Sequence, residues 1–266
     1  MTKKQFLEHE KNLNDKGYTI LKQIIPKRDI KSFRKLMDDR RNNPLPDDQR
    51  LFMNNKTMFP MGINDPKFDM LTKYFSFKKL NTFLKKMTDD KLRYCHHFDI
   101  HVGHNQQGAW HDDVQAHFEG SVYDPQMAQY KMDMSQCPLN FFQEYEGERF
   151  QIYRVCMYLQ DHNGEGGISF RTGSHLDVSK IDYETPDIEA GDIIVFDVRL
   201  LHKANCYNTI EENLARMTLF MCVGKDNVFT DYHTQGAINR QVKQTNGTYC
   251  LADNVKKELD KNNYIY

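Results

Sequence analysis

The sequence predicts a mainly β fold with flanking α-helices, because its residue pattern changes near residue 91. Downstream of Lys91, runs of β-branched and aromatic residues are separated by glycine-containing turns, without intervening helical stretches. Short strands in this arrangement are typical of a β-sandwich or a jelly roll. Upstream, amphipathic stretches with helical spacing dominate, so the first 90 residues are expected to be mainly helical support for a sheet.

The elements follow from periodicity and from turn residues. Four helical pieces are predicted near the N-terminus, at 4–16, 28–41, 68–74 and 78–87. Five strands are predicted downstream, at 92–102, 150–159, 166–170, 192–198 and 215–223. A short β-rich run is expected at 17–21, a proline-bearing loop at 42–56, and short helices near 234–242 and 252–260.

A chain of 266 residues can fold as one domain, and we expect a single domain over 1–266. Within it, 1–90 would be helical support, 91–228 the core, and 229–266 a polar C-terminal tail. The segment 114–149 has no clean period and is expected to be a loop insert. Loops of this length are often functional, so substrate specificity is expected there.

Composition excludes several classes of protein. The net charge of -1 argues against binding to nucleic acid and against binding to a membrane through a polybasic segment. No run of 18 apolar residues is present, so no membrane span is expected, and the charged start of the chain favours a cytoplasmic location. The six cysteines are scattered without C-x-x-C spacing, which disfavours a zinc ribbon and favours free thiols.

Charge is distributed unevenly along the chain. Basic residues outnumber acidic ones over 1–100, and acidic residues dominate 101–200. Most of these carboxylates are expected to form a solvated acidic surface. The acidic middle nevertheless favours a cationic or neutral substrate over a strongly anionic one.

The strongest candidate for a metal-binding motif is Trp110-His111-Asp112-Asp113. Alternate residues of an extended strand point the same way, so His111 and Asp113 can hold one ion while Asp112 points elsewhere. With a distant second histidine, His202, they form a facial triad of two imidazoles and one carboxylate. That ligand set suits Fe(II) and leaves positions open for substrate and oxygen.

Four blocks of sequence carry a family resemblance. They are Trp110-His111-Asp112-Asp113; Tyr158-Leu159-Gln160-Asp161-His162 leading to Gly166-Gly167; Arg171-Thr172-Gly173-Ser174-His175; and the run from Ala190-Gly191-Asp192 through Phe196-Asp197 to His202 and Arg216-Met217-Thr218. In this order the chain resembles the phytanoyl-CoA dioxygenase-like family of Fe(II)/2-oxoglutarate-dependent oxygenases. Thr172 stands where the family typically has proline, which alters a turn and touches no expected ligand.

The resemblance implies a double-stranded β-helix core, of the jelly-roll or cupin-like type, and a cofactor set of Fe(II), 2-oxoglutarate and O2. It implies that His111, Asp113 and His202 are the catalytic metal ligands. Arg216 would bind the distal carboxylate of 2-oxoglutarate, with the Thr218 hydroxyl beside it. The implied reaction is hydroxylation of a C–H bond in a small-molecule, sugar- or lipid-linked substrate, with release of succinate and CO2. An intact Asp113 argues against halogenation, since related halogenating enzymes replace this carboxylate.

Several histidines and one arginine have competing interpretations. His97-Phe98-Asp99 is a second H-x-D, but it lies in an aromatic strand and at a less usual distance from Tyr158, so packed strand residues are expected. His175 is expected to fix a turn rather than to line the pocket, and His101, His104 and His117 are expected to belong to polar loops rather than to the mouth of the site. Arg154 would meet either an anionic substrate or a nearby carboxylate.

Three other functional classes remain open at this point. A non-catalytic jelly-roll binding module would be expected to show decayed motif positions, and none of the four blocks is decayed. A cupin-type metal enzyme that does not use 2-oxoglutarate would need no Arg216-x-Thr218 anchor. A capsid-like structural jelly roll would need no metal triad.

Overall fold

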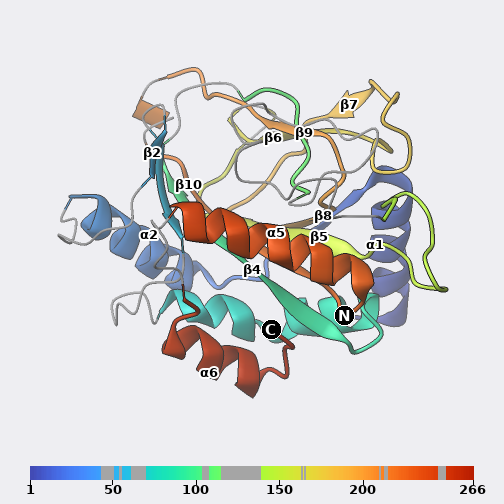
Figure 1. The fold of residues 1–266 in the computed structure, drawn as a ribbon. Coiled ribbons are helices and arrows are strands. Elements are labelled where there is room, and N and C mark those ends of the chain that lie inside the picture. Colours follow the sequence, from blue (N-terminus) through green and yellow to red (C-terminus); the bar gives the residue numbers. More distant parts are fainter. Residues whose placement is uncertain are drawn as a thin grey trace.

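The computed structural model describes residues 1–42, 51–53, 56–60, 70–103, 108–114, 139–162, 164, 166–209, 211–212, 215–244 and 250–266. The expected loop positions His104 and His117, and residues 115–138 of the expected insert, lie outside this description. Figure 1 shows two layers of strands, with helices below and beside them.

The larger layer is a seven-stranded antiparallel sheet. In spatial order its strands are β1 (Tyr18–Leu21), β8 (Ile193–Asp197), β5 (Ile152–Tyr158), β10 (Met217–Lys225), β4 (Leu92–Val102), β3 (Lys56–Pro60) and β2 (Leu51–Met53). The smaller layer has three antiparallel strands in the order β7 (Tyr183–Glu184), β6 (Ile168–Arg171), β9 (His202–Ala204).

The two sheets pack face to face and form the jelly-roll core. Tyr18 of the large sheet stacks on Phe170 of the small sheet, with ring centroids 4.5 Å apart, and Phe170 lies 5.3 Å from Phe196. Tyr158 and Ile168 belong to the same buried cluster. The mainly β core predicted from strand spacing is confirmed.

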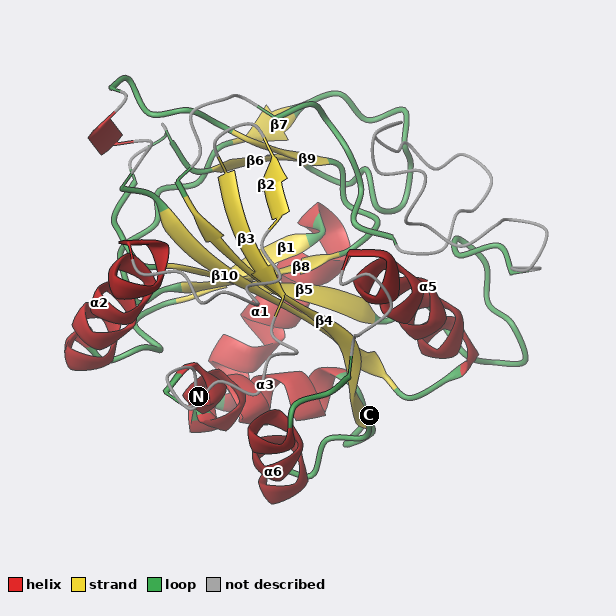
Figure 2. Ribbon diagram, turned by 60° about the vertical axis from the view of Figure 1, so that its left-hand side comes forward, coloured by secondary structure: helices red, strands yellow, loops and turns green. Residues whose placement is uncertain are grey.

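The opposite face of the large sheet is covered by helices. These helices are α1 (Lys3–Lys16), α2 (Lys27–Asn42), η2 (Leu71–Ser76, a 3-10 helix), α3 (Lys78–Met87) and α6 (Asp253–Lys261). Helix α5 (Val228–Gln244) instead packs on the face that carries the small sheet, where its Phe229 clusters with Ile152 and Cys222. In Figure 2, α1, α3 and α6 lie on the side of the large sheet away from β6 and β9. All seven residues of β5 are therefore buried, since both of its faces are covered.

Strand periodicity sorts these residues between the two faces. On β5, Val155 and Met157 join the cluster under the helices, while Cys156 and Tyr158 face the small sheet. On β10, Leu219 packs under the helices and Thr218 lines a cavity between the sheets. The two-residue repeat thus directs polar side chains of β5 and β10 into the space between the layers.

The strand predictions agree closely with the structure, and the predictions of small elements agree less well. Strand β4 has the predicted bounds, and the other four predicted strands occur within a few residues of them. The loop expected over 42–56 is wrong in its described part, because 51–53 form β2 and Lys56 opens β3. Three-residue strands are too short to show periodicity, and β7 and β9 were missed for the same reason.

The C-terminal region is packed more deeply than its polar sequence indicates. Helix α5 begins at Val228 and extends beyond the short helix expected at 234–242. His233, Arg240 and Gln241 on this helix are buried, and Phe229 packs against Phe141 of the expected insert. Within the described residues, no helix is long and apolar enough to cross a membrane.

The helical layer should contribute directly to stability. Leu84 of α3 is fully buried against the sheet, so Leu84→Ala is expected to lower the free energy of unfolding by about 2–5 kcal/mol. Leu7 lies on α1 and is half exposed, and Leu7→Ala should change it by less than about 0.5 kcal/mol. Urea unfolding followed by circular dichroism measures both. Equal losses in the two variants would contradict this assignment of the core.

Candidate metal and co-substrate site

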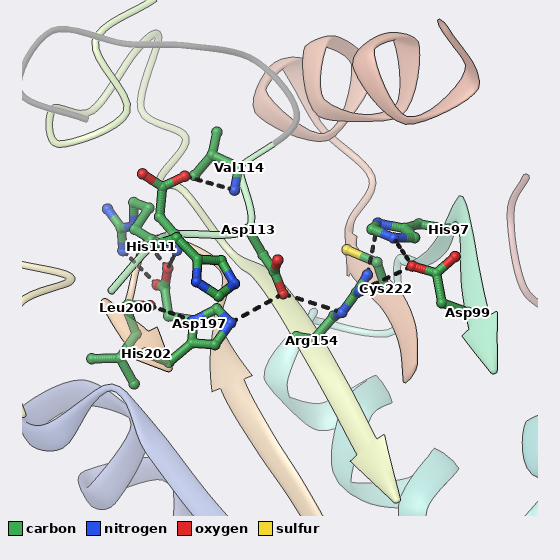
Figure 3. Close-up of polar contacts among 12 residues, drawn as sticks. His97, Asp99, His111, Asp113, Val114, Arg154, Asp197, Leu200, His202 and Cys222 are labelled. Atoms are coloured by element: carbon green, nitrogen blue, oxygen red, sulfur yellow. Dashed lines mark hydrogen bonds and ion pairs between the residues drawn. The ribbon is translucent and has the colours of Figure 1, made fainter. Parts of the chain in front are cut away.

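His111, Asp113 and His202 come together at one end of the space between the sheets (Figure 3). One ligand atom from each lies within 4.8 Å of the others. His202 Nε2 is 3.6 Å from Asp113 Oδ2, and the two imidazole centroids are 4.4 Å apart. Among the described residues, this is the group of His, Cys, Asp and Glu side chains whose geometry suits a metal ion.

Backbone pairing produces this convergence. His111 N–H donates to the His202 carbonyl at 3.0 Å, and His202 N–H donates to the His111 carbonyl at 2.9 Å. Asp113 N–H donates to the Val198 carbonyl at 2.8 Å. His111 forms an isolated bridge rather than part of a longer strand, but the pairing places both imidazoles on the same side. Asp112 turns away, and its Oδ1 accepts from Val114 N–H at 3.0 Å.

Both imidazoles are oriented for ligation through Nε2. His111 Nδ1 lies 2.8 Å from the Ala109 carbonyl, and His202 Nδ1 lies 2.9 Å from the Leu200 carbonyl. A carbonyl only accepts, so each Nδ1 carries the proton and each Nε2 presents a lone pair. Burial, reinforced by the neighbouring His111, lowers the pKa of His202 to about 4, so this imidazole is neutral at physiological pH.

The third member, Asp113, is paired with a buried arginine. Arg154 Nε on β5 lies 3.2 Å from Asp113 Oδ2. Burial alone would raise the pKa of Asp113, but the Arg154 charge and the two imidazoles outweigh it and hold the pKa well below its usual range. Asp113 is therefore an anion, as a metal ligand must be.

The triad lines a cavity of about 90 Å³ that opens to solvent. Arg154, Tyr158, Arg216 and Thr218 also line it. Asp113 is the acidic residue among the described lining residues. The acidic surplus of residues 101–200 is thus not concentrated in this cavity, which carries two guanidinium groups.

Arg216 is buried in this cavity without an acidic partner in the described part of the chain. It is 5% exposed. Its guanidinium donates to the Asn205 carbonyl at 2.9 Å, the Tyr158 hydroxyl at 3.0 Å and the Gly167 carbonyl at 3.3 Å. Neutral acceptors fix its direction but leave its charge uncompensated, and a buried charge is costly unless paired. The position therefore suits an anionic ligand such as a carboxylate.

Sequence reasoning missed Tyr158 as a site residue. Its hydroxyl supports Arg216 and its ring lies under the guanidinium, whose central carbon is 5.4 Å from the ring centroid. Thr218 on β10 is buried, pairs with Tyr158 across the sheet and lines the same cavity. Tyr158 lies in one of the four sequence blocks, but its contact with Arg216 joins two strands and leaves no local signal.

The remaining histidine interpretations are resolved by contacts. His97 and Asp99 lie on β4, both almost fully buried, and bond to each other at 2.8 Å and to Arg154 rather than to the triad. His175 Nε2 bonds the Asn14 carbonyl at 3.2 Å, which links its turn to α1. His101 lines the cavity, although a loop role was expected.

Comparisons with known proteins identify the fold. No family model matches the chain, and no curated protein matches it in sequence. Solved structures do match. The non-heme alpha-ketoglutarate-dependent epimerase SnoN from nogalamycin biosynthesis superposes with a TM-score of 0.60 at 12% identity, covering 86% of this chain and 90% of SnoN.

Two further solved structures superpose on the chain in a similar way. HygX from Streptomyces hygroscopicus, solved with nickel and 2-oxoglutarate bound, gives a TM-score of 0.57 at 13% identity, covering 85% of this chain and 88% of HygX. EctD from S. alaskensis, solved with 2-oxoglutarate and 5-hydroxyectoine, gives 0.57 at 14%, covering 85% of this chain and 76% of EctD. At these identities the likeness establishes a shared fold, the double-stranded β-helix.

The geometry predicts a divalent metal site that depends on His111. His111→Ala should weaken Mn(II) binding by more than about 100-fold, because loss of a ligand should exceed the roughly 10–100-fold effect of losing an outer partner. His9→Ala is the matched control, since His9 lies on α1 and bonds Thr19 at 2.9 Å. Electron paramagnetic resonance of free Mn(II) measures the affinity. Unchanged binding in His111→Ala would refute the site.

Proposed function

We propose that this chain is an Fe(II)- and 2-oxoglutarate-dependent dioxygenase of the phytanoyl-CoA dioxygenase type, forming one oxygenase domain over residues 1–266. His111, Asp113 and His202 would hold the iron. Arg216 would bind the distal carboxylate of 2-oxoglutarate, with Thr218 beside it. The reaction proposed is hydroxylation of a C–H bond, with release of succinate and CO2.

One observation carries this proposal. The buried Arg216 guanidinium, without an acidic partner among the described residues, lines the same cavity as the three candidate metal ligands. A metal-binding protein that does not use 2-oxoglutarate would have no need of an uncompensated cation at this position. The observation therefore favours the oxygenase over a binding module and over another cupin-type metal enzyme.

The residues have distinct roles in this proposal. Bound Fe(II), with 2-oxoglutarate and O2, would supply the oxidative chemistry. The Leu200 and Ala109 carbonyls hold the imidazoles with Nε2 directed at the metal position. Tyr158 and the Gly167 carbonyl aim Arg216 at the co-substrate carboxylate. Tyr158, Arg216 and Thr218 are each at most 5% exposed, which limits access of water to this part of the cavity.

The relatives in fold support a small-molecule substrate. HygX has been solved with hygromycin B and SnoN with nogalamycin RO. SnoN is named an alpha-ketoglutarate-dependent epimerase, so this fold also supports reactions that do not end in a hydroxyl group. We therefore place a small molecule, free or linked to a sugar or lipid, in the cavity, and hydroxylation as its most direct outcome.

Succinate formation tests the proposed activity. Protein, Fe(II), ascorbate and 2-oxoglutarate in air should release succinate slowly without substrate and faster when a suitable small molecule is added. Candidate molecules are screened by this acceleration and by a mass gain of one oxygen atom. Succinate release equal to that of His111→Ala under all conditions would reject the proposal.

Arg216 provides a separate prediction. Arg216→Met should raise the dissociation constant for 2-oxoglutarate roughly 10- to 150-fold, since a charged hydrogen-bonded pair is worth about 1.5–3 kcal/mol. Mn(II) affinity should be unchanged, because Arg216 is not a ligand. Arg149→Met, at an exposed arginine, is the control. Calorimetric titration of the metal-free protein with Mn(II), and then of the metal-loaded protein with 2-oxoglutarate, gives both constants. A normal 2-oxoglutarate affinity in Arg216→Met would contradict the assigned role.

A further inference from the structure

A buried charge network continues from the candidate metal site to the C-terminal helix. Arg154 contacts Asp113 through Nε, His97 Nδ1 through a guanidinium N–H at 2.7 Å, and Asp99 Oδ2 at 3.4 Å. Arg240 on α5 donates to the same Asp99 oxygen at 2.8 Å. Figure 3 shows Arg154 placed between Asp113 on one side and His97 and Asp99 on the other. Arg154, Asp99 and Arg240 are each at most 4% exposed.

His97 adds no charge to this network. Burial, together with the charges of Arg154 and Arg240, lowers its pKa to about 3. Its Nδ1 accepts from an Arg154 N–H, and its Nε2 contacts both the Arg240 guanidinium and, at 2.8 Å, the Asp99 carboxylate. The charged members are therefore two guanidinium groups and two carboxylates.

The two carboxylates have different arginine partners: Asp99 contacts both Arg154 and Arg240, and Asp113 contacts Arg154. Asp99 is the acidic partner of Arg240 among the described residues and is also a partner of Arg154. Among the described residues, Arg154 contacts both Asp99 and Asp113. Its Nε lies 3.2 Å from Asp113 Oδ2, and one of its terminal N–H groups lies 3.4 Å from Asp99 Oδ2. The two carboxylates therefore compete for the same guanidinium.

We propose that Asp99 is a positioning residue, the counter-anion that keeps Arg154 from capturing Asp113 and so leaves the Asp113 carboxylate available to a metal ion. This inference rests on the proposed metal site. Arg240 weakens the hold of Asp99 on Arg154, because it donates a hydrogen bond to the same Asp99 oxygen. The network thereby links α5, in a region expected to be a polar tail, to metal affinity at a site that α5 does not line.

The direction in which each substitution should change metal affinity follows from the balance of charges in the network. Asp99→Asn leaves two buried guanidinium groups without their shared anion, so Arg154 should pair fully with Asp113 and weaken metal binding. Arg240→Gln removes the competitor, so Asp99 should pair fully with Arg154 and release Asp113. Arg154→Met removes the cation that competes with the metal. A merely structural network predicts weaker binding in all three variants.

The test is Mn(II) affinity of the full-length protein, measured by electron paramagnetic resonance of the free ion. Asp99→Asn should weaken binding about 10-fold, the lower end of effects from outer partners of metal ligands. Arg240→Gln and Arg154→Met should bind at least as tightly as wild type. Asp192→Asn and Arg93→Gln are matched controls, since Asp192 pairs with Lys22 and Arg93 with Asp226.

The outcomes separate this inference from the proposed function. Weaker binding in Arg240→Gln and Arg154→Met would overturn the inference alone, as would unchanged affinity in a folded Asp99→Asn. If Asp99→Asn does not fold, Arg240→Gln and Arg154→Met still test the inference, because they show whether loss of either arginine weakens metal binding. Absence of Mn(II) binding by wild type would overturn both the inference and the metal site.

Discussion

The site depends on one backbone pairing, the two hydrogen bonds between His111 and His202. The bond from Asp113 N–H to the Val198 carbonyl extends it by two residues. Together they bring a segment between strands to the edge of the small sheet and set two imidazoles and a carboxylate around one point. Because side chains alternate along extended backbone, the same pairing turns Asp112 away. A shift of one residue would exchange Asp113 for Asp112.

The rest of the cavity follows from coverage of both faces of the large sheet. Helices take the alternate residues on one face of β5 and β10, which leaves Arg154, Tyr158 and Thr218 for the space between the sheets. Because these side chains are buried, charges among them act strongly at short range. Two guanidinium groups lie in this space. The charge of Arg154 is balanced by carboxylates, whereas Arg216 is hydrogen-bonded to neutral acceptors among the described residues.

Features set by neighbouring residues could be predicted from the sequence, whereas contacts between distant parts of the chain could not. Strand periodicity gave β4 its bounds, and the H-x-D pattern selected His111 and Asp113 for what proves to be a compact cluster. The contact between Arg240 and Asp99 spans 141 residues, so it leaves no pattern in the chain. Polar residues usually indicate a solvated face, and α5 therefore looked like a tail although Arg240 is buried.

The central claim is that iron and 2-oxoglutarate bind together in one cavity. The most direct measurement is the visible absorption spectrum of the wild-type protein under anaerobic conditions, as Fe(II) and then 2-oxoglutarate are added. We expect a weak charge-transfer band that needs both additions and is absent with Zn(II), since the band reports chelation of iron by the 2-oxo acid. Iron binding without such a band at saturating 2-oxoglutarate would show that 2-oxoglutarate does not chelate the bound iron.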